Sequence, residues 1–252
     1  MAETLPDIDQ EARRLLDLVS ARGLDARLIG GMAVRLLAAD DLDPALERDI
    51  ADLDFVVSKR DARALAQLLE GAGYRGDEEF NALNGARRLL YLDDVNRRQI
   101  DVFIGRFSMC HDLPIADHLD ERPDTLPAAD VLMTKLQIVS LNAKDRADIY
   151  ALLASHEVSA RDPDAIDASR VASLAGEDWG LQHTFELNLQ RLRDGLGELP
   201  LEAAVVARIG RRIEALSDAI EMAPKSRRWR IRARIGERKR WYEEPEEVDR
   251  DM

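Results

Sequence analysis

The segment ARLIGGMAVRLLAAD (residues 26–40), followed by RDIADLDFVV (residues 48–57), carries the strongest fold signal of this chain. In the first segment, a short apolar run ends at Gly30 and Gly31, and a helical spacing of apolar residues resumes at Met32. The second segment alternates and then becomes continuously apolar, as in a buried strand. Together they predict a strand, a glycine turn, a helix over 32–39 and a second strand over 52–57.

The same patterns predict helices and strands on both sides of these segments. Residues 10–22 have a helical period that stops before Gly23, and the stretch after Ser58 reads as a capped helix that closes at Gly71. Residues 86–94 and 97–105 are both typical of strands, and the turn-forming residues between them predict a hairpin. The sheet should therefore have about four or five strands.

The character of the sequence changes after about residue 110. Residues 111–127 carry three prolines and little periodicity, and the chain beyond Ala128 reads as helix, with segments at 129–142, 144–156, 164–176, 178–197 and 201–220. The expected fold class is α+β, with a small mixed sheet followed by an all-helical part. We expect domains at 1–124 and 125–224 and a C-terminal tail at 225–252.

Composition limits the class of protein. The 252 residues are 46% apolar and 34% charged, with a formal net charge of −13, which is typical of a soluble globular protein. One cysteine and four histidines without paired spacing argue against disulfides and structural zinc. No apolar run approaches the roughly 20 residues of a membrane helix, and the N-terminus lacks the pattern of a signal peptide, so we expect no membrane partner and a cytoplasmic location.

Three carboxylates stand in otherwise apolar strands. Asp52 and Asp54 are two residues apart, so they should project from one face of the strand, and Asp101 is the lone acid of a later strand. Adjacent strands lie about 4.8 Å apart. Oxygen ligands so close together suit Mg²⁺, which binds one or two carboxylates together with substrate phosphates. The sequence therefore predicts a metal site for phosphoryl transfer.

These residues resemble the nucleotidyltransferase superfamily of the DNA polymerase β type. The resemblance rests on Gly30-Gly31, on Asp52-x-Asp54 and on Asp101, and covers about residues 10–105. It implies an enzyme that moves a nucleoside monophosphate from a nucleoside triphosphate (NTP) to an acceptor. It also implies that the two acids of the D-x-D motif ligate Mg²⁺, and that Asp101 completes the site and helps to deprotonate the acceptor hydroxyl.

Within the superfamily, Lys135 and the stretch Lys144-Asp145-x-x-Asp148 resemble the AbiEii/MenT toxin branch. This branch implies tRNA or a protein as the acceptor and a cognate antitoxin as partner. The chain departs from it by having Gly31 where that branch usually has serine, a feature shared with aminoglycoside-type enzymes that act on small molecules. A small-molecule nucleotidyltransferase and a nucleotide-binding scaffold without turnover therefore remain as alternatives.

Four further roles concern the nucleotide. The glycine pair would let the backbone approach a triphosphate at a helix start, where the dipole favours anions. Lys135 would either neutralise these phosphates or extend along the edge of an apolar stripe. Asp145 would belong to the site or simply occupy a favourable first helical turn. Arg48 would hold a phosphate or pair with a neighbouring acid.

The remaining candidate residues lie in the connector at about 110–127 and in the C-terminal tail. His111 and His118 are expected to be surface loop residues, and Cys110 a small apolar filler. Residues 225–240 contain nine basic residues and one acid, whereas residues 241–252 contain six acids and one base. The basic part suits contact with RNA, docking on the acidic body of this protein, or an unstructured segment.

Overall fold

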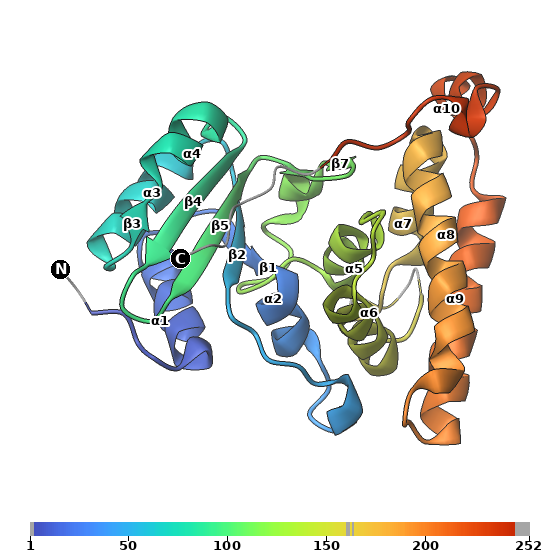
Figure 1. Ribbon diagram of the computed structural model, residues 1–252, viewed down its shortest axis with the longest axis horizontal. Coiled ribbons are helices and arrows are strands. Elements are labelled where there is room, and N and C mark those ends of the chain that lie inside the picture. The colour runs from blue at the N-terminus through green and yellow to red at the C-terminus, as the bar shows by residue number, and fades with distance from the viewer. Residues whose placement is uncertain (1–2, 160–161, 163, 245–252) are drawn as a thin grey trace. The chain divides into compact units, whose positions relative to one another are not determined.

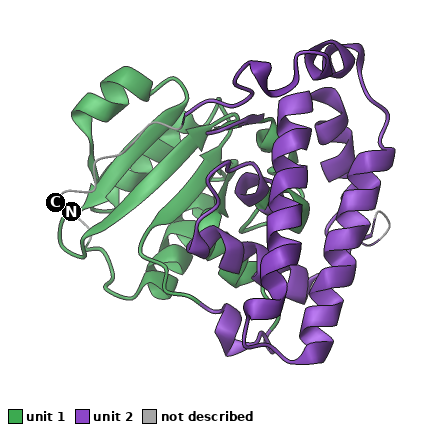
Figure 2. Cartoon of the chain, turned by 45° about the vertical axis from the view of Figure 1, so that its right-hand side comes forward, with its two compact units in different colours: residues 1–39, 48–107, 113–131 green, residues 40–47, 108–112, 132–252 purple. Residues whose placement is uncertain are grey.

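The computed structural model describes residues 3–159, 162 and 164–244. Two compact units make up the chain (Figure 2). The first contains residues 1–39, 48–107 and 113–131, and the second contains residues 40–47, 108–112 and 132–252. The predicted boundary at 124/125 falls inside a stretch of the first unit, and the short segments 40–47 and 108–112 belong to the second.

The first unit is built on a five-stranded mixed sheet (Figure 1). The strand order is β1-β2-β5-β4-β3, in which only β2 and β5 run parallel, and the α+β class predicted from the sequence is confirmed. The strands are β1 (Ala26–Ile29), β2 (Leu53–Val57), β3 (Arg75–Gly76), β4 (Arg88–Asp93) and β5 (Arg98–Ile104). The helices of this unit are α1 (Ile8–Ala21), α2 (Gly30–Leu37), α3 (Ala62–Gly71), α4 (Glu78–Asn84) and the 3-10 turn η2 (Ile115–His118).

Three boundaries in this unit differ from expectation. Helix α2 begins at Gly30, not at Met32, because a glycine tolerates the positive φ of +67° at its first position. Strand β2 begins at Leu53, so Asp52 precedes the strand. Helix α3 begins at Ala62, because the carbonyl and hydroxyl of Ser58 both accept the amide of Asp61 and form a separate turn.

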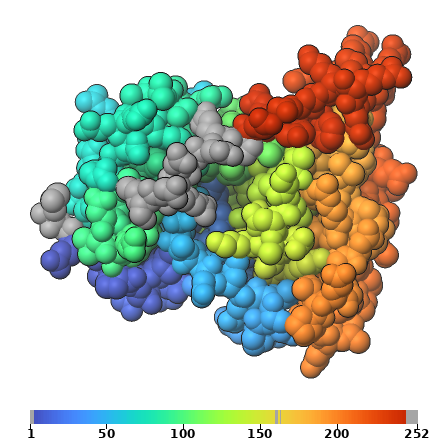
Figure 3. Space-filling model, in the orientation of Figure 1, coloured from blue at the N-terminus to red at the C-terminus, as the bar shows by residue number. Residues whose placement is uncertain are grey.

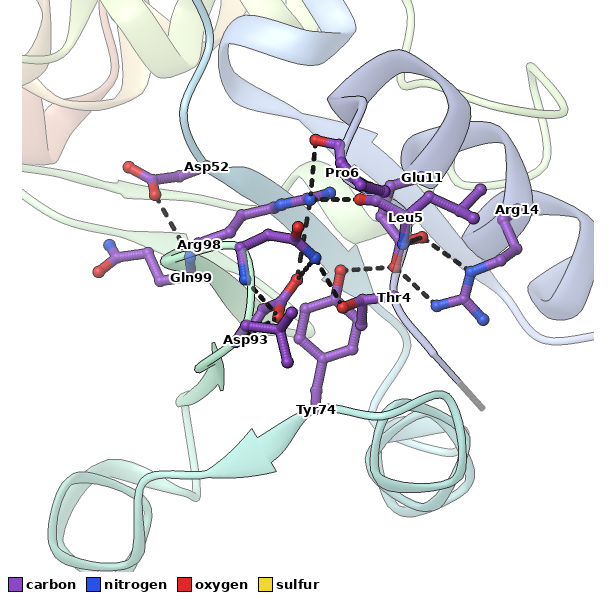
Figure 4. Close-up of polar contacts among 12 residues, drawn as sticks. Thr4, Leu5, Pro6, Glu11, Arg14, Asp52, Tyr74, Asp93, Arg98 and Gln99 are labelled. Carbon is purple, nitrogen blue, oxygen red and sulfur yellow. Dashed lines mark hydrogen bonds and ion pairs between the residues drawn. The ribbon is translucent and has the colours of Figure 1, made fainter. Parts of the chain in front are cut away.

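A buried polar network ties the start of the chain to this sheet (Figure 4). The Glu11 carboxylate is fully buried and accepts hydrogen bonds from Arg14 (2.6 and 2.8 Å), from the Tyr74 hydroxyl (2.7 Å) and from the Leu5 amide (3.1 Å). Arg98, at the start of β5, donates to the carbonyl of Leu5 (2.6 Å). Because buried polar groups cost free energy unless they are paired, these contacts stabilise the packing of Leu5 and α1 against the sheet.

The second unit is helical in its described part. Its core comes from the mutual packing of α6 (Ala143–Ser155), α7 (Ala168–Glu177), α8 (Trp179–Gly195) and α9 (Ala203–Met222). Smaller elements are the 3-10 turns η1 (Pro44–Leu46), η3 (Leu196–Glu198) and η4 (Gly236–Arg238) and the short helix α10 (Arg227–Ala233). The helix α5 (Ala128–Leu136) and the two-stranded ribbon of β6 (Phe107–Ser108) and β7 (Asp112–Leu113) lie where the chain passes between the units.

The helix expected over 129–142 is shorter in the structure. It ends at Leu136, and the side-chain amide of Asn188 donates to the carbonyls of Leu136 (2.8 Å) and Ile138 (2.7 Å). These bonds satisfy carbonyls that a longer helix would have paired internally. Asn142 instead caps α6 by accepting the amide of Asp145. None of the helices in the described ranges is long and apolar enough to cross a membrane.

Candidate nucleotide and metal site

Asp54 lies directly against the glycine turn. It is the register partner of Ile29, the last residue of β1, and a Cβ atom placed on Gly30 would come within 1.9 Å of the Asp54 Oδ2 atom. A side chain at position 30 would therefore collide with the Asp54 side chain. The positive φ of Gly30 and the close approach of the carboxylate both require glycine at this position.

Gly31 makes room for a different charged group. A Cβ on Gly31 would lie 2.2 Å from Nη2 of Arg48, whose Nη1 donates to the carbonyl of Asp49 (2.9 Å). The carbonyl of Arg48 in turn accepts a hydrogen bond from Arg35 of α2 (2.8 Å). The two glycines therefore bring a carboxylate and a guanidinium to the first turn of α2, where backbone amides point away from the helix.

The second acid of the predicted site lies beside the first. Asp54 on β2 and Asp101 on β5 are register partners in the parallel pair, so their side chains project from the same face of the sheet. Asp52 comes two residues before Asp54 and is connected to β5 through its Oδ1 atom, which accepts the amide of Gln99 at 3.3 Å (Figure 4). The structure thus brings Asp54 and Asp101 side by side on neighbouring strands, with Asp52 just before the start of β2.

Asp101 already has a counter-ion, which the sequence reading did not identify. Nε and Nη2 of Arg88 each lie 2.7 Å from Asp101 Oδ1, and the two side chains are only 11% and 6% exposed. The Arg88 guanidinium also lies 5.4 Å from the ring centre of Phe80 and 5.1 Å from that of Phe103. The side chain of Gln99 reaches the other oxygen of Asp101 at 3.4 Å.

The hairpin register contains the signal that could have revealed Arg88. Counting back from the turn pairs Leu90 with Asp101 and Arg88 with Phe103, so Arg88 is a diagonal neighbour of Asp101 on the same face. In the described residues, no group of three or more His, Cys, Asp or Glu side chains is arranged to hold a metal ion. Oxygen donors for a cation are nevertheless present at Asp52 and Asp54, and Mg²⁺ needs no more than one or two carboxylates when substrate phosphates supply the rest.

The structure places Lys135 in an ion-pair cluster of the second unit. Its Nζ lies 3.2 Å from Asp145 Oδ1 and 2.9 Å from Asp148 Oδ2, and all three side chains are at most 12% exposed. Lys135 lies in the last turn of α5, which ends at Leu136. Lys135 and Asp145, both predicted to serve the nucleotide, are therefore brought to each other, and their proposed roles remain predictions.

The connector histidines are partly buried, and each lies beside a polar partner. His111 Nε2 lies 2.8 Å from the Thr184 hydroxyl, and burial lowers the pKa of His111 to about 4. His118 Nδ1 lies 3.1 Å from a carboxylate oxygen of the fully buried Asp130. Cys110 is buried, as expected of an apolar filler, and burial raises the pKa of its thiol.

No protein-family model and no curated protein matches this chain. Among solved structures, an antigenic nucleotidyltransferase-like protein from Paracoccidioides brasiliensis is similar over 90% of this chain and 97% of its own, with 14% sequence identity and a TM-score of 0.42. Terminal uridylyl transferase 4 from Trypanosoma brucei, with bound GTP, is similar over 68% of this chain and 57% of its own, with 16% identity and a TM-score of 0.30. Because both likenesses are low, the function has to be inferred from the residues of this chain.

Proposed function

We propose that this protein is a Mg²⁺-dependent nucleotidyltransferase, which moves a nucleoside monophosphate from an NTP to an acceptor with release of pyrophosphate. One observation carries the proposal. The Asp54 carboxylate is seated on Gly30 at the first turn of α2, beside Asp101 on the parallel strand. Gly30 therefore lies close to the carboxylates of this sheet, and this proximity supports a site that binds both phosphates and a metal.

Each residue has a task that its position supports. The first amides of α2 would donate to triphosphate oxygens, and the Arg48 guanidinium would add positive charge beside them. Asp52 and Asp54 would hold Mg²⁺, which when bound neutralises phosphate charge and orients the reacting oxygens. Asp101 would accept a proton from the acceptor hydroxyl only after Arg88 had moved away from it, because Arg88 occupies its Oδ1 atom.

The Arg88–Asp101 pair specifically favours a second candidate function. A carboxylate that stays paired with arginine neither ligates a cation strongly nor accepts a proton, since the ion pair stabilises its charged form. A protein with this pair kept in place would bind an NTP without transferring it. The alternative is thus a nucleotide-binding scaffold that has lost turnover.

The acceptor is proposed from the resemblance to the toxin branch, as tRNA or a protein with a separately encoded antitoxin as partner. A small hydroxylated molecule, as in the aminoglycoside-type enzymes, is the other acceptor class. An assay that supplies each acceptor separately distinguishes the two classes.

Incubation with each of the four α-labelled NTPs and Mg²⁺ tests both candidates. Total tRNA, a protein extract and a metabolite pool serve as separate acceptor arms, and pyrophosphate release is measured beside calorimetric NTP binding. Labelled acceptor with pyrophosphate release supports the transferase. Binding without pyrophosphate release in every arm supports the scaffold, and absence of NTP binding contradicts both.

A further inference from the structure

The basic segment, residues 227–240, packs on the rest of the second unit through Trp229 and Arg232. Trp229 Nε1 donates to the side-chain oxygen of Gln182 (3.0 Å), and the Arg232 guanidinium lies 4.8 Å from the ring centre of Trp179. Just beyond the segment, Trp241 Nε1 donates to the Thr184 hydroxyl (3.0 Å). Helix α10 contacts α7 and α8, and Figure 3 shows the red C-terminal region on the surface of that unit.

This docking turns the other cations outward. Arg232 is partly buried and donates to the carbonyls of Gly236 (2.7 Å) and Lys239 (2.7 Å). Arg228 and Arg240 are exposed and lie near single carboxylates. Five exposed side chains have no hydrogen bond or ion pair within the described part of the chain: Arg227, Arg230, Arg234, Arg238 and Lys239.

These cations repel one another, and this repulsion costs free energy. Ion pairs within the described residues offset only part of that cost. The one acid of the segment, Glu237, faces His183, with 3.1 Å between its carboxylate and the imidazole Nε2. The protein carries a net charge of −13, yet among the described residues only Asp178 and Glu244 form ion pairs with the exposed cations of the segment. Like charges gathered on a stable surface are typical of a binding site for an external anion.

We propose that the basic segment binds the phosphodiester backbone of a nucleic acid. Six of its seven exposed cations are arginines, whose planar guanidinium groups bind phosphate oxygens in a bidentate manner. They extend over 14 consecutive residues, which suits a continuous polyanion better than isolated carboxylates. This inference does not depend on nucleotidyl transfer.

The structure also predicts the mode of binding. Trp179, Trp229 and Trp241 are engaged with other residues of the unit, and so they are not free to stack on bases. Binding should therefore be sequence-independent and strongly salt-dependent. The acidic body does not prevent it, because at 0.1 M salt charges are screened beyond about 10 Å.

A charge-matched pair of variants of the full-length chain tests the proposal. The first is Arg230→Gln/Arg234→Gln/Arg238→Gln, and the control, Arg193→Gln/Arg208→Gln/Arg211→Gln, removes three exposed arginines from α8 and α9. The probe is a labelled single-stranded RNA, measured by fluorescence anisotropy at several salt concentrations, with duplex DNA as a second arm. The first variant should keep the wild-type melting temperature and lower the slope of log K against log salt by about two units, whereas the control should bind as wild type does.

The opposing class of partner is an acidic protein docked on the exposed Ile231 and Ile235, which are 64% and 41% exposed. Polyglutamate serves as the carboxylate probe, and Ile231→Ser/Ile235→Ser as the discriminating variant. RNA binding should survive this variant and exceed polyglutamate binding at equal charge concentration. Equal RNA binding by both arginine variants, or preferential binding of polyglutamate, would overturn the proposal.

Discussion

Arg88 places Nε and Nη2 each 2.7 Å from a single oxygen of Asp101, on the adjacent strand of the sheet. The pair is almost fully shielded from water, so its two charges depend on each other. A divalent cation and Arg88 would therefore compete for the same carboxylate. This competition makes the predicted third metal ligand conditional on a rearrangement.

Arg88→Met should release Asp101 for a cation. Loss of a partner from a buried ion pair should lower the free energy of unfolding by about 3–5 kcal/mol. Added Mg²⁺ or Mn²⁺ should then raise the melting temperature of the variant more than that of the wild type. The control is Arg75→Met, which breaks the exposed pair with Asp94 and should cost at most about 1 kcal/mol. Equal responses of wild type and Arg88→Met to the cations would assign the pair a purely structural role.

Asp52→Asn and Asp54→Asn should each reduce nucleotidyl transfer by about a hundredfold or more, since each removes a group that acts on developing phosphate charge. Asp52→Asn should not lower the melting temperature in the absence of metal, because the amide oxygen of asparagine can still accept the Gln99 amide. Asp49→Asn changes an exposed acid nearby and should leave both properties unchanged. Full activity in the Asp54 variant would refute the proposed metal site.

Gly30→Ala should be more damaging than Gly23→Ala. Both glycines have a positive φ, +67° and +62°, so each substitution should cost about 1–2 kcal/mol in backbone strain. Only at Gly30 would the new Cβ also collide with Asp54, whereas nothing lies within 4 Å at Gly23. Chemical unfolding should show the additional loss, and calorimetry should show weaker NTP binding for Gly30→Ala alone. Identical behaviour of the two variants would mean that the close approach has no consequence.

Lys135→Met should destabilise the second unit, because Asp145 and Asp148 would lose the cation that faces both. The expected loss is about 3–5 kcal/mol, whereas Lys144→Met, at an exposed neighbour, should have little effect. If Lys135 also serves phosphates, its variant should bind NTP more weakly at a temperature where it is fully folded. Unchanged NTP affinity there would remove Lys135 from the nucleotide site.

His111 should make stability fall in mild acid. Burial lowers its pKa from the usual 6.5 to about 4, so the unfolded chain binds the proton more readily than the folded chain. Its contribution is then fully present above pH 6.5 and is lost as the pH falls towards 4, with a total of about 3 kcal/mol. Urea unfolding from pH 7 to pH 4 should show a smaller loss for His111→Gln than for the wild type. Parallel curves for the two proteins would contradict this assignment.

Local patterns in the sequence were enough to predict the strand–glycine–helix unit, the hairpin of β4 and β5, and the placement of Asp54 and Asp101 on strands. Backbone propensities, glycine conformations and the two-residue period of a strand act over a few residues, so they can be read from neighbouring letters. For the same reason, the boundaries of α2, α3 and α5 were less accurate. Each depends on a hydrogen bond or a glycine conformation at one position.

Which charges pair depends on contacts between residues that are far apart in the sequence. Arg88 reaches Asp101 across a hairpin, Lys135 reaches Asp145 and Asp148 on the following helix, and the tryptophans of the C-terminal region turn towards α8. Electrostatic partners are selected by distance and burial in space, which depend on strand register and helix packing. From the sequence alone, each basic residue has several acids as possible partners. The fold determines which of them lies within ion-pair distance.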